Sequence, residues 1–409
     1  MLYVRDPLWG SIAVDATAAR LLDTPAIQRL RYVRQLGLAH LVYPGATHSR
    51  FEHALGAYHL ARRALANLRE SGALAAVAVD EPAIVSAAAL LHDVGHYPFS
   101  HALEEIGAPH HEKLAGALVT EGAVADILRA EIGPDAPQRV FDLICGSSQS
   151  PLQGLISGSF DLDKIDYLQR DARMCGVPYG EIDEDRLIQA MLVLRDPATG
   201  TSSLGIREKG LSAVETLLFA KYQMYRNVYW HHACRSATAM YKRIVELAVE
   251  RGTVAIDALG RYTDEGLLHA VEASPGDSDP MLDALRERRL FKRAFEAPAA
   301  ALPGLELEWL ADDRPRTRKA EARIAGHLGL NTDEVLVDYP AKTQMLGLDL
   351  LVIQRDRTVR RLTKAGLQGA IDLPRLAGEL YASARCLRVF TARRTTLPDT
   401  AALDLIGGS

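Results

Sequence analysis

The chain has 409 residues, of which 48% are hydrophobic and 24% charged, and its formal net charge is −5 at pH 7. This composition is typical of a folded globular protein and excludes a globally basic surface for nucleic acid or acidic membranes. The length allows one large core with a smaller second unit. No run of about 18 apolar residues is present, so we expect no membrane span.

The cysteines and the N-terminus bear on the cellular compartment. The four cysteines, at positions 145, 175, 234 and 386, show neither the spacing of a metal site nor the density of a disulfide framework. The N-terminal residues lack the charged and then apolar pattern of a signal peptide. We therefore expect a cytoplasmic protein with reduced thiols.

Residues 1–295 are predicted to be mainly helical. Phe51, Leu55 and Tyr58 recur at helical spacing, on a helix that Thr47 or Ser49 would cap. A second helix begins near residue 82 and is apolar almost all round over residues 84–91, which predicts a buried central helix. A glycine and a proline at positions 95 and 98 end it. A long helical stretch rich in Tyr, Trp and Met is predicted over about 212–250.

The composition changes at residues 296–304, where a run rich in alanine and proline predicts a linker. Beyond it, β-rich runs at 334–339, 348–354 and 386–391 alternate with helical stretches near 315–328 and 372–384. The predicted fold class is therefore mainly α. A helical core over 1–295 is followed by a small α/β domain over 296–409, for which we expect a role in oligomerisation or regulation.

Histidines are crowded into one part of the chain. Nine of the 13 lie in the 72 residues from 40 to 111. Imidazoles gather in this way when they hold a metal, a proton or a phosphate. We predict that four side chains from three separate helices share one metal ion: His53, His92, Asp93 and Asp163.

Two imidazoles and two carboxylates suit one divalent cation of the borderline or hard kind, namely Mn, Fe, Ni, Zn or Mg. Open coordination positions would remain for water and a substrate oxygen, as metal-assisted hydrolysis requires. For the aspartate-rich run over 160–171, an alternative is a solvated charged face beside an apolar stripe.

Further histidines and basic residues extend this site. His96, His101, His110 and His111 offer a general acid for a leaving alkoxide, and a hydrogen-bonded structural histidine is the alternative for each one. Phosphate groups need additional donors, for which the candidates are Arg50, Lys164 and Arg226. Surface ion pairs are the alternative for these three.

Five ordered segments lie within residues 1–295: Asp23-Thr-Pro-Ala-Ile-Gln-Arg-Leu-Arg31, Gln35-Leu-Gly37, Tyr43-Pro-Gly-Ala-Thr-His-Ser-Arg-Phe-Glu-His53, His92-Asp-Val-Gly-His-Tyr-Pro-Phe-Ser-His101 and Asp163-Lys-Ile-Asp-Tyr-Leu-Gln-Arg-Asp171. Together they resemble the HD-domain deoxynucleoside triphosphate triphosphohydrolases, in particular their nucleotide-regulated branch. The resemblance implies a helical HD fold and hydrolysis of a dNTP at the α-phosphorus, which releases a deoxynucleoside and inorganic triphosphate.

The resemblance also implies a role for each matching residue. The metal ligands would be the four named above. His101, with His96 and His111, would handle the α-phosphate and the leaving oxygen, and Glu104 would support them where related sequences often have Asp. The implied phosphate-binding residues are Arg50, Lys164, Tyr167 and Arg226. Gln35, Leu36 and Asp171 would lie against the sugar and help to select deoxyribose.

Regulation is implied as well, with GTP or dNTP effectors bound between the subunits of a homo-oligomer, which we expect to be a tetramer. The first effector pocket is matched by Asp23, Gln28 and Arg31, and the second by Arg207, Lys209, Arg288 and Lys292. The chain departs from its relatives at Leu2 and Tyr3, where a basic residue is frequent.

Two other functions remain open on the sequence. One is a phosphohydrolase with the same metal site that acts on nucleoside monophosphates or other phosphoesters. The other is a nucleotide-sensing or nucleic-acid-binding module in which the site is vestigial.

Overall fold

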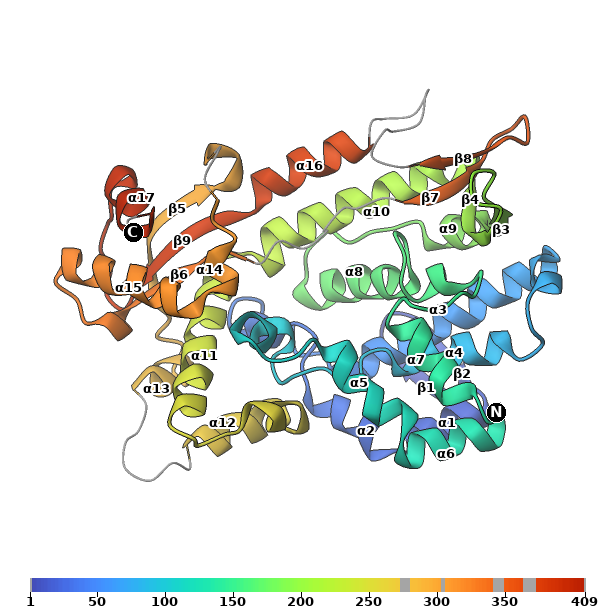
Figure 1. Ribbon diagram of the computed structural model, residues 1–409, viewed down its shortest axis with the longest axis horizontal. Helices are drawn as coiled ribbons and strands as arrows, with labels where there is room; N and C mark the ends of the chain where they lie inside the picture. The colour runs from blue at the N-terminus through green and yellow to red at the C-terminus, as the bar shows by residue number, and fades with distance from the viewer. Residues whose placement is uncertain (1, 273–279, 303–305, 341–348, 363–372, 408–409) are drawn as a thin grey trace.

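The computed structural model describes residues 2–272, 280–302, 306–340, 349–362 and 373–407. The chain is mainly helical and carries small sheets, three of them within these residues, so the predicted fold class is confirmed. In Figure 1, the helices of the first half of the chain lie together at the lower right, and the C-terminal helices and strands lie along the left and the top.

The helices up to residue 286 are α1 (Ala16–Leu22), α2 (Pro25–Arg29), α3 (Arg50–Glu70), α4 (Glu81–Leu91), α5 (His111–Thr120), α6 (Gly122–Glu131), α7 (Ala136–Ile144), α8 (Leu162–Cys175), α9 (Glu184–Ala190), α10 (Leu211–Met224), α11 (His232–Glu250), α12 (Asp264–Glu272) and α13 (Pro280–Arg286). They are followed by α14 (Trp309–Asp312), α15 (Arg314–Leu328), α16 (Leu373–Ala384) and α17 (Asp399–Gly407). Two short helical segments matter for the site, namely the 3-10 helix η4 (Ser100–Ile106) and the π-helix η7 (Tyr225–Tyr229).

Three helices, α3, α4 and α8, form the centre of the larger body. α4 is the buried central helix that the sequence predicts, and its residues Val85, Leu90 and Leu91 are fully buried. It packs against α3 and α7, while the other side of α3 packs against α8. Ser49 precedes α3 as predicted, and its backbone N–H donates to the carboxylate of Glu52 at 2.6 Å, which satisfies a free donor at the helix start.

The strands form a hairpin and two larger sheets. The hairpin pairs β1 (Leu2–Asp6) with β2 (Gly10–Val14). The second sheet has the order β3 (Met191–Arg195), β4 (Ser202–Arg207), β7 (Leu350–Ile353), β8 (Val359–Leu362), in which only β4 and β7 run parallel. The third sheet has the order β5 (Lys292–Pro298), β9 (Cys386–Thr391), β6 (Val335–Asp338) and is antiparallel.

Two sequence expectations differ from the structure. The region predicted to be mainly helical also contains the strands β1 to β4. The long helix predicted over 212–250 is two helices, because the chain passes through the π-helix at 225–229 and α11 restarts after His231. The side chain of His231 accepts from the backbone N–H of Ala233, which caps the new helix.

The division at residue 295/296 stays a prediction, and the structure shows features that cross it. Strand β5 spans residue 295, so part of the predicted linker at 296–304 is strand, and residues 303–305 lie outside the described residues. Strand β7 adds to the edge of β4, and α16 packs against α10. The predicted elements beyond the linker are present as α15, β6, β7, α16 and β9, and residues 348 and 372 of these predictions lie outside the described part.

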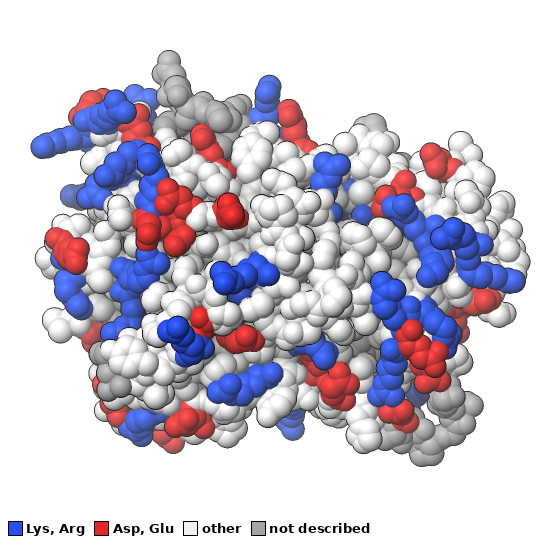
Figure 2. Space-filling view, turned by 180° about the vertical axis from the view of Figure 1, so that it is seen from behind, with Lys and Arg blue, Asp and Glu red and all other residues white. Residues whose placement is uncertain are grey.

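Charge on the back of the molecule is mixed. In Figure 2, the larger groups of Lys and Arg side chains lie beside acidic ones, and the middle of this face is mostly uncharged. That distribution agrees with the small net charge and differs from a continuous basic stripe of the kind that tracks a nucleic-acid backbone. Among the helices that the structure describes, none has the length and apolarity needed to cross a bilayer.

Candidate active site

The structure brings the four predicted metal donors to one point. His53 lies on α3, His92 and Asp93 end α4, and Asp163 lies in the first turn of α8. His53 Nε2 is 3.1 Å from His92 Nε2 and 2.9 Å from Asp163 Oδ1. His92 Nε2 is 3.4 Å from Asp93 Oδ1 and 3.5 Å from Asp163 Oδ1. Metal–ligand bonds of about 2.1 Å place neighbouring donor atoms roughly 3.0–3.4 Å apart. The donor atoms of His53, His92 and Asp93 lie within 4.8 Å of one another and can hold one ion, and Asp163 lies beside both imidazoles.

The hydrogen bonds of His53 and His92 show that Nδ1 of each ring carries a proton, which leaves Nε2 of each ring to face the predicted metal position. His92 Nδ1 lies 2.9 Å from the carbonyl oxygen of Ala89, which can only accept, so Nδ1 carries the proton. His53 Nδ1 lies 2.7 Å from Asp166 Oδ2 and donates in the same way. Both Nε2 lone pairs therefore face each other beside two carboxylates. These acceptor atoms repel one another unless a proton or a metal cation lies between them.

The raised pKa of His53 also indicates that the surroundings of this ring favour a positive charge. Burial alone would lower the pKa of this imidazole, but the carboxylates of Asp163 and Asp166 outweigh burial and raise the pKa to about 10. A divalent cation at this point meets that demand more fully than a proton does. The chemistry of the donor set thus fits a divalent metal, and the role of each residue as a ligand stays a prediction.

Asp166, which the sequence did not single out, supports His53 from behind. Its carboxylate also accepts from Trp9 Nε1 at 2.5 Å and from two nitrogens of Arg170 at 2.9 Å each. The space for this network exists because position 56 on α3 is glycine, where a Cβ would lie only 1.8 Å from Asp166 Oδ1. A carboxylate behind a ligating histidine orients the ring and raises its basicity.

We expect Asp166→Asn to weaken metal binding by about 10–100-fold, because the amide cannot hold the His53 ring as a carboxylate does. The measurement is competition with a chelator of known affinity. The matched control is Asp6→Asn, since Asp6 accepts from the other side of Arg170 at 2.8 Å and does not touch His53. Equal loss of metal in both variants would show that the effect comes from Arg170 and the fold.

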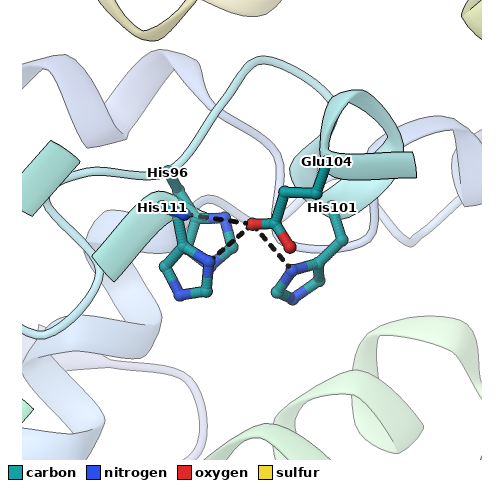
Figure 3. A group of neighbouring side chains, drawn as sticks. All are labelled: His96, His101, Glu104 and His111. Carbon is teal, nitrogen blue, oxygen red and sulfur yellow. Dashed lines mark hydrogen bonds and ion pairs between the residues drawn. The ribbon is translucent and has the colours of Figure 1, made fainter. Parts of the chain in front are cut away.

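A second group of side chains lies on the segment after α4, drawn in Figure 3: His96, His101, Glu104 and His111. The three imidazoles surround the carboxylate of Glu104. Oε1 of Glu104 is 2.6 Å from His111 Nδ1 and 3.5 Å from His101 Nδ1. His96 is 1% exposed and its Nε2 lies 3.3 Å from Asp93 Oδ1, which connects the group to the metal donors.

The shape of this second group favours proton transfer over a second metal. The rings of His96 and His111 are stacked, with centroids 3.8 Å apart and planes 19° apart, so their nitrogens do not point at one common atom. Burial lowers the pKa of His111 to about 4 in spite of its contact with Glu104, so this ring is neutral near pH 7. The side chain of His101 is 60% exposed, and His101 is thus the member that a substrate can reach.

The local backbone explains why these residues meet. Phe99 and Ser100 have positive φ values of 53° and 70°, a conformation that costs energy in non-glycine residues and is held here by surrounding contacts. The backbone N–H of Phe99 donates to buried Asp264 at 2.8 Å. Gly95 lets the start of α5 approach, since a Cβ there would lie 2.1 Å from the carbonyl oxygen of His111.

A cavity of about 680 Å³ joins both groups. Its lining includes all four residues of the group in Figure 3, together with His92, Asp93 and Asp163. Three buried side-chain atoms on its wall have no hydrogen-bond partner among the described residues, namely Gln35 Oε1, Arg50 Nε and His96 Nδ1. Buried polar atoms are normally paired, so these three indicate that a polar ligand completes the site.

The predicted phosphate and sugar residues have the following contacts. Arg50 Nη1 donates to Asp93 Oδ2 at 2.5 Å, and Lys164 Nζ donates to Asp161 Oδ2 at 2.5 Å. Asp171 accepts from Tyr229 Oη at 2.7 Å and contacts His48 Nε2 at 2.8 Å, and neither partner was singled out in the sequence. The remaining predicted residues on the cavity wall are Leu36 and Tyr167.

Arg226 is the predicted phosphate-binding residue that the structure does not bring to the cavity. Its side chain is exposed and donates to the hydroxyl of Tyr222 at 2.7 Å. The π-helix directs Tyr225 and Tyr229 to the cavity instead. The cavity wall also includes Lys221 of α10, which the sequence did not single out.

The predicted effector residues lie on the surface in separate places. Gln28 accepts from Arg31 Nε at 2.9 Å, and the Arg31 guanidinium stacks 3.6 Å over the ring of Phe51. Asp23 lies nearby at the end of α1. The second set is divided between Arg207 and Lys209 at the end of β4 and Arg288 and Lys292 before and on β5. These strands lie at opposite ends of Figure 1, so in a single chain the second set forms no pocket.

Comparison with protein families finds two adjoining matches. Residues 50–171 match the HD domain, and residues 182–366 match the HD associated region. The first match begins at Arg50 and ends at Asp171, and so contains all four predicted metal donors and the group in Figure 3.

Several relatives and solved structures are similar over most of the chain. An uncharacterized Bacillus subtilis protein, YwfO, is 36% identical over 71% of this chain and 70% of its own length. The bovine deoxynucleoside triphosphate triphosphohydrolase SAMHD1 is 26% identical to this chain, and the match covers 71% of this chain and 58% of that protein. A hypothetical protein from Aquifex aeolicus has a TM-score of 0.73 at 27% identity, with 96% of both chains covered. A Bacteroides thetaiotaomicron phosphohydrolase has the same fold. It is 24% identical and has a TM-score of 0.74, with 96% of this chain and 100% of that one covered.

Proposed function

The chain belongs to the HD-domain phosphohydrolase family, and we propose that it hydrolyses deoxynucleoside triphosphates to a deoxynucleoside and inorganic triphosphate. The resemblance of its five segments to the dNTP triphosphohydrolases and the similarity to a protein of that name support this substrate. The observation that carries the proposal is the grouping of His53, His92 and Asp93, with Asp163 beside both imidazoles, next to a cavity whose wall holds buried donors and acceptors without partners among the described residues.

The proposed metal ligands are His53, His92, Asp93 and Asp163. A divalent ion bound there supplies positive charge to the phosphate oxygens and makes a water molecule more acidic. The reaction adds water oxygen to the α-phosphorus and breaks the bond between that phosphorus and O5′. The new alkoxide at O5′ needs a proton, for which we propose His101, because it is the exposed imidazole of its group and lies beside the carboxylate of Glu104.

The remaining residues bind and orient the substrate in this proposal. Arg50 has one free buried N–H, which can donate to a phosphate oxygen, while its other nitrogens keep Asp93 and the chain at residue 100 in place. Lys164 lies directly after Asp163 and would neutralise the following phosphate. The sugar would lie between Leu36, the free amide oxygen of Gln35 and the carboxylate of Asp171, where Tyr229 and His48 hold that carboxylate in position.

We expect the purified chain, with Mn²⁺ or Mg²⁺, to convert a dNTP into deoxynucleoside and inorganic triphosphate. Each dNTP is tested alone and with GTP or a second dNTP as effector, and products are separated by ion exchange. In ¹⁸O-labelled water the label should appear in the triphosphate and not in the deoxynucleoside. Release of orthophosphate from nucleoside monophosphates without triphosphate formation would identify a monoesterase instead. No turnover under all conditions would contradict the proposal.

Regulation is part of the same proposal. Strand β4, which ends at Arg207, and strand β5, which begins at Lys292, lie at opposite ends of the molecule in Figure 1. The two halves of this set could therefore share one nucleotide only if two chains meet. We propose that effector nucleotides bind there and promote a tetramer. Sedimentation of the chain with and without GTP and a dNTP measures this directly, and an unchanged oligomeric state in the presence of an effector would contradict it.

A further inference from the structure

Asp264 is a buried carboxylate beside the candidate active site, and the proposed mechanism gives it no role. It is the first residue of α12 and is 2% exposed. Its Oδ1 atom accepts from the backbone N–H of Phe99 at 2.8 Å, and its Oδ2 atom accepts from the backbone N–H of Arg34 at 3.0 Å. One carboxylate thus joins two segments that lie far apart in the chain.

The two segments carry different parts of the proposed active site. Phe99 lies two residues before His101, the proposed proton donor. Arg34 lies directly before Gln35, whose free amide oxygen is proposed to lie against the sugar. Phe99, His101 and Gln35 all line the cavity. The position of the proton donor relative to the sugar therefore depends on how these two segments meet.

Direct contacts between the segments are close. The hydroxyl of Ser100 donates to the backbone carbonyl oxygen of Gln35 at 2.8 Å. Gly37 allows the carbonyl oxygen of Phe99 to approach, since a Cβ at position 37 would lie 2.8 Å from it. Phe99 and Ser100 both have positive φ values, which non-glycine residues keep only where surrounding contacts hold them. The hydrogen bond from the Phe99 N–H to Asp264 is such a contact, made by the strained residue itself.

The start of α12 is itself fixed to the turn that follows α4. The carbonyl oxygen of Tyr262 accepts from Arg29 Nη1 at 2.8 Å. Nη2 of the same guanidinium donates to the carbonyl oxygens of Val94 at 3.0 Å and His96 at 2.7 Å. Asp264 therefore extends from a point that is already held against the segment after the predicted metal donors, so it can set the place of Phe99 rather than follow it.

A carboxylate is a costly group in this position. Burial raises the pKa of Asp264 to about 6, against the two backbone N–H groups and the guanidinium of Arg34, which lies 3.6 Å away. Carboxylates with a pKa perturbed in this way gather at functional sites. Packing alone would be served by an apolar side chain, whereas two backbone N–H groups at once need an acceptor with two oxygens.

We propose that Asp264 is a positioning residue of the active site, which fixes the segment that carries His101 against the segment that carries Gln35. The inference rests on the proposed function and deepens it. With both segments held, the imidazole of His101 reaches O5′ while the sugar lies against Gln35. Asp264 acts through the backbones of these segments, so its loss should impair the proton transfer and leave the metal content unchanged.

Asp264→Asn is the test, because the amide keeps one acceptor oxygen and turns an N–H group toward one of the two backbone donors. We expect kcat for a dNTP to fall by about 10–100-fold, as a small displacement of a reacting group does, at unchanged metal content. The loss should vanish with a 4-nitrophenyl phosphate ester, whose leaving group needs no proton. In a His101→Gln background, Asp264→Asn should lower kcat by less than about twofold further, because both changes impair the same step.

Asp196→Asn is the matched control, since Asp196 is a buried carboxylate, 1% exposed, that accepts from the backbone N–H of Ala198 at 2.8 Å in the turn between β3 and β4. It should lower the melting temperature and leave kcat unchanged. Asp264→Glu is the second variant, which keeps both acceptor oxygens and whose added methylene should still lower kcat. Unchanged kcat in Asp264→Asn, or in Asp264→Glu where the amide variant does not fold, would overturn the inference. So would an equal loss in the His101→Gln background.

The two proposals fail separately. Hydrogen exchange needs no substrate, and the backbone amides within residues 34–37 and 97–101 should lose protection together in Asp264→Asn and keep it in Asp196→Asn. Joint loss of protection, in a chain that turns over no dNTP, refutes the proposed reaction and keeps Asp264 as the residue that joins the two segments. Turnover of dNTPs that does not depend on Asp264 refutes the positioning role alone.

Discussion

Asp93→Asn is expected to lose bound metal and turnover together. Asp93 supplies one of the four acceptors around the metal point, and the amide offers a weaker oxygen and an N–H group that a cation repels. The ion contributes several kcal/mol to the reaction, so we expect turnover to fall by about 10³-fold or more. Metal content is measured by elemental analysis of the purified protein, and turnover by triphosphate release.

Folding must be separated from chemistry in this variant, because Asp93 is also the partner of Arg50, which is 3% exposed. Removal of one partner from a buried ion pair costs about 3–5 kcal/mol, so the melting temperature of each variant is needed. Asp171→Asn is the matched control, since Asp171 is a buried carboxylate on the same cavity wall that contacts His48 and Tyr229. It should keep its metal. An Asp93→Asn protein that retains both metal and activity would contradict the site assignment.

The metal donors were accessible to sequence reasoning because their chemistry is unusual for their positions. A His-Asp doublet at the end of an apolar helix has no packing reason to exist, and His53 lies on the inner face of a patterned helix. In the structure His53 and His92 lie within 3.5 Å of Asp163, and their role as metal ligands stays a prediction.

Other site residues could not be found in this way. Asp166 lies on a helix with several charged residues, and Lys221 is one of two charged residues on the mostly apolar α10. Charge alone does not say which of these side chains turn inward. Arg226 illustrates the reverse case, since it was predicted to bind phosphate and the structure does not bring it to the cavity. The π-helix shifts the face by a fraction of a turn and leaves Arg226 exposed. Such an insertion has no local sequence signal that the pattern of apolar residues would reveal.

The fold, too, could be predicted only in part from the sequence. The buried helix α4 and its end were predictable from an apolar run and two helix-breaking residues. The sheet of β3, β4, β7 and β8 was not, because β4 pairs at Gly205 with Leu351, far along the chain. Pairing over such a separation depends on the packed helices between the strands and not on the strand residues alone. The boundary expected after residue 295 stays a prediction, and strand β5 crosses it.

His101→Gln is expected to lower kcat by about 10²–10⁴-fold, the usual contribution of a positioned general acid. The metal content should stay unchanged, because His101 contacts Glu104 and its ring neighbours but none of the four metal donors. The loss should shrink for a substrate whose leaving group needs no proton, such as a 4-nitrophenyl phosphate ester. Rates for both substrates, with metal content, measure this.

His110→Gln is the matched control for this prediction, because His110 is exposed to a similar degree, with 50% of its side chain accessible against 60% for His101. Its ring also lies near Glu104, at 3.8 Å, and it tilts against His111. If any imidazole near this carboxylate can deliver the proton, the two variants will lose activity equally. A loss confined to His101→Gln, which disappears with the 4-nitrophenyl ester, assigns the proton to one ring. An equal loss with both substrates would instead mean that His101 binds phosphate, because binding does not depend on the basicity of the leaving group.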